Sequence, residues 1–262
     1  MIGRIWAIAL NTFREAVRIR VLYGIIVLVV GANLMTLVLG QMANNEEARV
    51  TRDIGLAGIS LFGSLTAIFL GVFLLYTEVQ RRTIHAIVSK PIERWEFVIG
   101  KYLGMALVLT ILVVVFGVAM AGMLGLQGVG VTTAVIKALV LSWFEVLTVA
   151  AIAIFFSSFS TPFMSGIFAL AMWVIGRLTP DVEAAARTAA PWIRTLTKIT
   201  LEIVPDLHLF AVSGRTVGGD HVSVHADFVS WGYVATAASY GILWIAGLLI
   251  LAAVIFQRRD FV

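Results

Sequence analysis

The histidines and their acidic neighbours are the side chains of this sequence that could hold a metal ion. His221 and His225 are four residues apart, which places two imidazoles on one face of a helix, and Asp220 and Asp227 flank them. A glycine pair before them and alternating valines between them indicate a turn and extended chain instead of a helix. We therefore expect no metal site here.

The sequence also contains no phosphate-binding loop for a nucleotide and no cysteine for thiol chemistry. Gly100-Lys101 is the nearest approach to a phosphate-binding loop, but Tyr102 follows where Ser or Thr is needed, and Trp95 replaces the first glycine. The chain has no cysteine, which excludes a thiolate metal site and a cysteine nucleophile. We expect no catalytic residue and no cofactor in this chain, so an energy-consuming process would need a partner or an ion gradient.

Glu145 is the one acidic residue well inside a long apolar run. Such a carboxylate could relay protons in an ion-coupled carrier. The alternative is a carboxyl group at a helix interface that hydrogen-bonds a neighbour. We favour this alternative, because no basic partner, broken helix or inverted repeat accompanies Glu145.

The composition shows where these residues must lie. Of 262 residues, 60% are hydrophobic and 13% are charged, and a soluble fold of this length could not bury so much apolar surface. A spanning helix needs about 20 mostly apolar residues. Six runs qualify, and we expect an all-α integral membrane protein with spans at about 21–40, 55–77, 97–126, 133–156, 162–178 and 230–256.

Basic residues predict the orientation of these spans. The net charge of +4 resembles a nucleic-acid signal, but the basic residues lie beside apolar runs, where they set topology, and we expect no nucleic-acid partner. They are concentrated on the side that holds both chain ends, so both ends should be cytoplasmic. Ser160-Thr161 before Pro162 predicts a hydroxyl-capped start of the fifth span.

Residues 1–20 have the pattern of an amphipathic helix. Arg14 and Arg18 fall on one side, and Trp6 and Phe13 fall on the other. Such a helix lies flat in the headgroup plane. A basic anchor that sets only the topology is the alternative interpretation.

The loop between the second and third spans, residues 78–96, is the most informative segment. Ile84, Ile87 and Val88 share one face of a short helix, and Arg81 and Arg82 lie toward the other. A short two-faced helix can dock in a partner's groove. A basic loop that sets only the topology explains the same residues equally well, so both interpretations stay open at this point.

This loop resembles the permease subunits of type-2 ABC exporters, and most closely the branch that includes the permease of nitrous-oxide reductase maturation. The shared pattern is an acidic residue, a basic-Thr turn, an apolar helix, Ser-x-Pro, Arg and Gly-Lys. Three further segments resemble the family: 9–18, Pro205 to Phe210, and 257–261. The residues that match the loop pattern, or lie in it, are Glu78, Arg81, Arg82, Thr83, Ile84, Ile87, Val88, Pro91 and Arg94.

The resemblance implies a single transmembrane domain, 1–262, in a bacterial inner membrane. Residues 1–20 would be an elbow helix, and 78–96 a coupling helix. Two ABC-type ATPase subunits would bind ATP and Mg²⁺, and a second permease copy would complete a homodimer. The function implied is ATP-driven export.

Other functions compete with export. A permease could transmit force to a periplasmic accessory protein without bulk transport, as the nitrous-oxide branch makes credible. A carrier using Glu145 is a third hypothesis. An intramembrane enzyme is a fourth, and it lacks a catalytic constellation.

The segment 179–229 should lie outside the cytoplasm. It contains one amphipathic helix that begins at Pro191, with Trp192, Leu196, Ile199 and Ile203 on one side. We expect this helix to lie at the outer interface or to re-enter the membrane. A loop that covers the bundle is the alternative.

Overall fold

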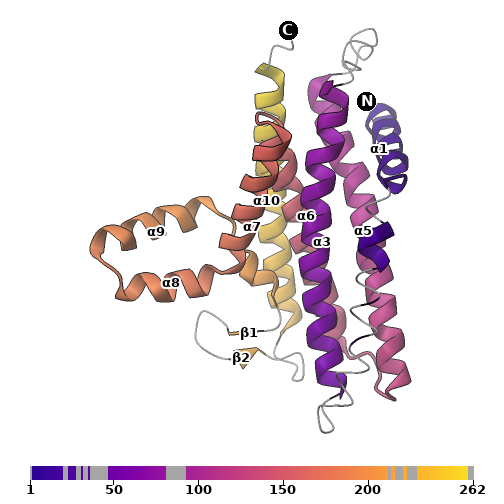
Figure 1. Ribbon diagram of the computed structural model, residues 1–262, viewed down its shortest axis with the longest axis vertical. Coiled ribbons are helices and arrows are strands. Elements are labelled where there is room, and N and C mark those ends of the chain that lie inside the picture. The colour runs from indigo at the N-terminus through magenta and orange to yellow at the C-terminus, as the bar shows by residue number, and fades with distance from the viewer. Residues whose placement is uncertain are drawn as a thin grey trace.

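The computed structural model describes residues 2–19, 23–27, 31, 35, 47–80, 93–211, 214–215, 221–222 and 229–258. Side chains of 47–50, 75–80, 214–215, 221–222 and 258 are outside that description. The described part is a bundle of long helices with a helical hairpin at its side (Figure 1). Its elements are α1 (Ile2–Val17), α3 (Glu47–Gln80), α5 (Arg94–Leu126), α6 (Thr133–Ser157), α7 (Pro162–Arg177), α8 (Thr179–Thr188), α9 (Pro191–Ile203), η1 (Leu207–Phe210), β1 (Gly214–Arg215), β2 (His221–Val222) and α10 (Trp231–Arg258).

Four of the described helices, α3, α5, α6 and α10, are long and apolar enough to cross a membrane. The pair α7 and α8 is a fifth candidate, bent by 71°. The expected fourth and sixth spans agree with α6 and α10 to within two residues at each end. The first expected span lies mostly outside the described residues, and those described in it, 23–27, 31 and 35, are helical.

Two expected boundaries and one expected helix cap need correction. Helix α3 begins at Glu47, eight residues before the expected second span, and α5 begins at Arg94, three residues before the third. A hydropathy pattern does not detect the first helical turns of α3 and α5, because charged residues there lower the mean hydropathy. The helix nevertheless continues past its apolar part. Thr161 is the N-cap of α7 in the described stretch 93–211, but its hydroxyl makes no capping hydrogen bond. Pro162 begins the helix as expected.

Helix α6 is the centre of the bundle, because α3, α5, α7 and α10 all pack on it. Its segment Val149–Ile154 is almost completely buried. A Cβ at Gly71 of α3 would lie 2.5 Å from the Cβ of Ala153, so only a glycine lets these two helices approach so closely.

One small feature departs from the all-α expectation. Strands β1 and β2 form a two-stranded antiparallel pair in which Arg215 is opposite His221. His221 therefore lies in extended chain, as its surrounding residues predict, and His225 lies outside the described residues. Among the described residues, no group of three or more His, Asp or Glu side chains could hold a metal ion.

Candidate functional site

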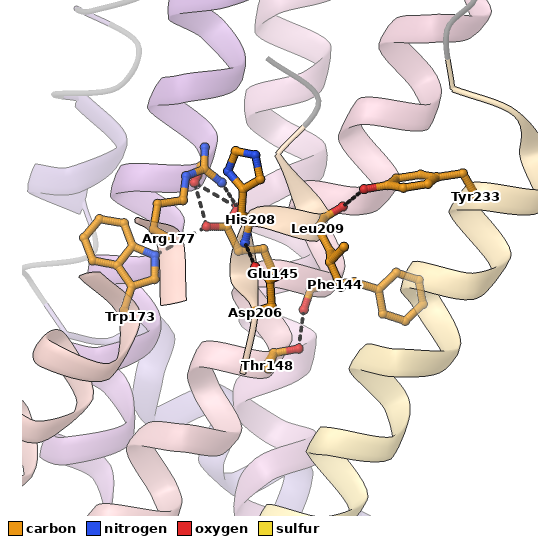
Figure 2. A network of polar contacts seen from close by, with 10 residues as sticks. Phe144, Glu145, Thr148, Trp173, Arg177, Asp206, His208, Leu209 and Tyr233 are labelled. Atoms are coloured by element: carbon orange, nitrogen blue, oxygen red, sulfur yellow. Dashed lines mark hydrogen bonds and ion pairs between the residues drawn. The ribbon is translucent and has the colours of Figure 1, made fainter. Parts of the chain in front are cut away.

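Glu145 lies at the middle of α6 and is completely buried. The Ser60 hydroxyl, from α3, lies 2.9 Å from both of its carboxylate oxygens. From α7, the indole N–H of Trp173 lies 3.4 Å away and the guanidinium of Arg177 lies 3.1 Å away (Figure 2). The carboxylate of α6 therefore joins three helices, because its donors come from α3 and from α7.

The Glu145–Arg177 pair overturns one expectation. We expected a carboxylate without a basic partner, and this is wrong, because Arg177 pairs with it. The other part of that expectation holds, since Glu145 accepts a hydrogen bond from a neighbouring helix. The signal that could have found the pair is the spacing of Trp173 and Arg177, which are four residues apart and so share a helix face.

Arg177 is the last residue of α7, immediately before the chain bends into α8. Its side chain is 28% exposed, so the cation reaches from the buried carboxylate toward the surface. A cation is also favoured at a helix C-terminus, where carbonyl groups point outward. The ion pair therefore fixes the point at which the α8–α9 hairpin leaves the bundle.

The segment after α9 fills the space beside this point. Leu207 and Phe210 of η1 are almost completely buried. A Cβ at Gly176 of α7 would lie 2.4 Å from the Pro205 carbonyl oxygen, so the chain passes directly over α7 there. Phe210 also lies against Gly241 of α10, where a Cβ would be 3.1 Å from its ring. The segment 205–210, which resembles a family element, thus anchors the base of the hairpin.

Asp206 lies beside Glu145 in the same polar region (Figure 2). Its carboxylate accepts a hydrogen bond of 3.1 Å from the backbone N–H of His208, and its own N–H donates to the Tyr240 hydroxyl at 2.8 Å. Burial raises the pKa of this carboxyl above its ordinary value, although the His208 N–H opposes the shift.

Lys101 occupies a second buried junction at the other end of the bundle. Its ammonium group, in a side chain 2% exposed, lies 3.4 Å from Glu15 of α1 and 3.5 Å from the carbonyl oxygen of Leu74 in α3. The group also lies over the Phe97 ring, 5.8 Å from its centroid. One cation on α5 therefore contacts α1 and α3 together.

Two glycines beside Lys101 let α1 lie directly on α5. A Cβ at Gly104 would lie 2.5 Å from Thr12 and 2.6 Å from the Ala9 carbonyl, and one at Gly100 would lie 2.7 Å from Ile8. Their spacing of four residues makes one smooth stripe on the helix. Sequence reasoning noticed Gly100-Lys101 but missed this contact.

The side chains of the expected elbow helix do not divide fully as expected, because Trp6 is exposed like the arginines. Arg14, Arg18 and Trp6 are exposed, whereas Phe13 is half-buried against the core. The face that packs on α5 contains the smaller residues Ala9, Thr12 and Ala16, which are fully buried.

Of the residues expected to couple to an ATPase, Arg94 has a side chain that the structure describes. Arg94 donates to the carbonyl oxygens of Phe256 at 3.4 Å and Gln257 at 2.9 Å. The Phe97 and Phe256 rings stack on each other, with centroids 5.8 Å apart. The backbone of Glu78 lies in α3. The others lie outside the described residues: Arg81, Arg82, Thr83, Ile84, Ile87, Val88 and Pro91.

The bundle of long apolar helices defines a multi-pass membrane protein. Comparison with protein families then shows to which family of membrane proteins the chain belongs. The pattern of the ABC-2 family transporter proteins matches residues 6–261, and the chain belongs to this family. A search of characterised proteins found no significant match to an individual relative.

Proposed function

We propose that this chain is the membrane-spanning permease subunit of an ABC-2 type ATP-driven exporter. The observation that carries the proposal is the family match, which covers almost the whole chain. The chain itself is a transport component and not an enzyme; ATP and Mg²⁺ would bind to a separate ATPase subunit. Two ATPase copies and two permease copies would form the complete transporter.

The ATPase would dock at the end of the bundle that holds both chain ends, through the segment 78–96. In support, the described helices that meet at this end are connected to one another. Lys101 links α1 and α3 to α5, and Arg94 links α5 to α10. A displacement of the segment between α3 and α5 would therefore be passed to all four helices.

The full topology that we propose has six spans and one domain, 1–262, in a bacterial inner membrane. Both termini would be cytoplasmic, and α1 would be the elbow helix on the inner leaflet. In support, α1 and the end of α10 lie at the same end of the bundle (Figure 1).

A force-transmitting permease that drives a periplasmic partner is the second candidate, because the sequence resembles the nitrous-oxide maturation branch. The ion-coupled carrier loses support from the geometry around Glu145. Glu145 pairs with Arg177 at 3.1 Å and accepts hydrogen bonds from Ser60 and Trp173, as expected of a carboxylate that holds helices together.

Co-purification tests the proposal. The tagged chain is solubilised from native membranes in a mild detergent, and the proteins bound to it are identified by mass spectrometry. A stoichiometric ABC-type ATPase is the expected result, and an additional periplasmic protein would favour the force-transmitting alternative. Recovery without an ATPase, in a detergent that keeps a known ABC transporter intact, would overturn the proposal.

A further inference from the structure

The α8–α9 hairpin stands away from the rest of the bundle (Figure 1). The chain turns by 71° between α7 and α8, so α8 lies closer to the membrane plane than to the bundle axis. Helix α9 runs back along α8, and the Arg194 guanidinium donates to the Arg187 carbonyl at 2.9 Å across the two helices. No residue of α9, all of which the structure describes, is buried.

Helix α9 has two chemically different faces. An apolar row occupies one face, with exposed fractions from 50% to 66%; its members are Trp192, Leu196, Ile199 and Ile203. Four large apolar side chains in a row on a helix of 13 residues need an apolar environment.

The opposite face of α9 is charged and turns toward α8. Both helices line a groove of about 460 Å³ that contains three cations and two carboxylates, which gives a net charge of +1: Arg187, Arg194, Lys198, Glu183 and Glu202. Because this face points at α8, the apolar row points away from α8. Figure 1 shows α9 on the side of α8 nearer the chain ends, so the row points toward the end of the bundle that holds the chain ends.

The length of α7 gives the depth at which the hairpin lies. Its 16 residues rise about 24 Å along the axis, whereas the hydrocarbon of a bilayer is about 30 Å thick. A helix that begins at one boundary would then end about 6 Å before the other. Amphipathic helices lie with their apolar face about 5–10 Å into the boundary between headgroups and acyl chains. The end of α7 thus places the hairpin near the boundary between headgroups and acyl chains. At this depth the charged face of α9 can reach the headgroups while its apolar face lies among the acyl chains.

We propose that the α8–α9 hairpin binds phospholipid of the leaflet farther from the chain ends. The apolar row of α9 lies among the acyl chains, and the cations of the groove contact the headgroup phosphates. The carboxylates reduce the positive charge, so the groove accepts zwitterionic as well as anionic phospholipids. This inference requires that the chain spans a membrane, and it does not depend on an ATPase partner.

Spin labels on the two faces of α9 test the proposal directly. Because the natural chain has no cysteine, Leu196→Cys and Lys198→Cys each give one labelling site. Each labelled protein is placed in nanodiscs of phosphatidylethanolamine and phosphatidylglycerol. Collision rates are then measured with oxygen, which concentrates in hydrocarbon, and with a water-soluble nickel chelate. Val118→Cys, on an exposed apolar position of α5, is the reference for a lipid-facing label.

We expect the label at Leu196 to collide with oxygen at nearly the rate of the Val118 reference and hardly with nickel. The label at Lys198 should show the reverse preference. Nickel access at both positions would place the hairpin in water and overturn the proposal. Protection of the Leu196 label from both reagents would overturn it too, and spin–spin broadening would then identify a second copy as the cover.

The headgroup contact has a separate test. Replacing Arg187, Arg194 and Lys198 together by Gln should abolish the phospholipid that the detergent-purified protein retains in native mass spectrometry. The reference is a variant with Glu183 and Glu202, the carboxylates of the same groove, changed to Gln, which should retain the phospholipid. Equal retention in both variants would show that the groove does not hold the phosphate.

Discussion

The Arg177 guanidinium lies 3.1 Å from the Glu145 carboxylate, and the two side chains differ sharply in exposure. Glu145 is completely buried, whereas 28% of the Arg177 side chain is exposed. A buried ion without its partner is much less stable than one that can turn toward water. Removing the Arg177 cation and removing the Glu145 carboxylate should therefore change the stability of the protein by different amounts.

Arg177→Gln should be the more damaging of the two neutral substitutions. It leaves a carboxylate in the bundle without a counter-charge, at a cost of about 3–5 kcal/mol. Glu145→Gln keeps an acceptor for Ser60 and releases a cation that can reach the surface, at a cost of about 1–2 kcal/mol. The unfolding temperature of the purified protein in detergent measures both effects.

The double variant completes the comparison of this pair. Its loss of stability should be smaller than the sum of the two single losses, because the stranded carboxylate is gone. Arg18→Gln, which removes an exposed arginine just after α1, should change stability by less than about 0.5 kcal/mol. A larger loss from Glu145→Gln than from Arg177→Gln would show that this account of the pair is wrong.

Gly176→Ala should destabilise the base of the hairpin by about 1–3 kcal/mol, because the new methyl group would overlap the Pro205 carbonyl. Gly166→Ala is the matched control on the same helix, since its nearest neighbour is a Val72 methyl 4.0 Å away. The control should be neutral or stabilising by up to about 1 kcal/mol, as alanine favours helix. Similar unfolding temperatures for the two variants would show that Pro205 can move aside.

The sequence predicted the long helices well because their signal is local. Apolar runs of spanning length identify α6 and α10 almost to the residue, and the α9 pattern was confirmed from Pro191 to Ile203. The start of α3 was missed because the helix extends beyond its apolar part.

The contacts between helices could not be predicted in the same way. Glu145 and Arg177 are 32 positions apart, and their pairing depends on how α7 packs on α6. The docking of α1 depends on Gly100 and Gly104, whose spacing suggests a close contact but does not identify the partner helix.

The raised pKa of Asp206 predicts a pH dependence of stability. Burial disfavours the charged carboxylate in the folded protein, and Glu183 adds to this effect, while His208 and Thr179 oppose it. The folded state then binds more protons than the unfolded state between the unfolded pKa, about 4, and the raised folded pKa. Stability should therefore fall as pH rises through this interval.

Asp206→Asn isolates that contribution, because asparagine keeps an acceptor for the His208 N–H. Below the interval the ionisation of Asp206 no longer contributes, and above it the variant should gain stability relative to the natural chain. The difference between the two unfolding temperatures is measured from pH 4 to pH 8. A difference that does not change with pH would exclude Asp206 as the cause.

Ile84→Asp should abolish binding of the proposed ATPase while the chain still inserts in the membrane. The substitution places a charge on the apolar face that Ile84, Ile87 and Val88 are expected to share. Ser89 lies toward the side of Arg81 and Arg82 by helical spacing, so Ser89→Asp adds the same charge there and should retain binding. Co-purification of the ATPase measures the effect, and full recovery with Ile84→Asp would remove this segment from the docking surface.

Glu15→Gln should release α1 from α5, and Lys101→Met should not. The Lys101 side chain is 2% exposed and that of Glu15 is 31% exposed, so removing the carboxylate leaves a buried ammonium, whereas removing the ammonium leaves a carboxylate that reaches water. Methionine also preserves most of the lysine stem against Phe97. Hydrogen exchange of the α1 amides measures the release, and it should accelerate in Glu15→Gln alone.

The double variant Glu15→Gln/Lys101→Met should restore slow exchange, because no buried charge remains and the contacts at Gly100 and Gly104 still hold α1. Fast exchange in the double variant would mean that the ion pair, and not the glycine stripe, holds α1 in place.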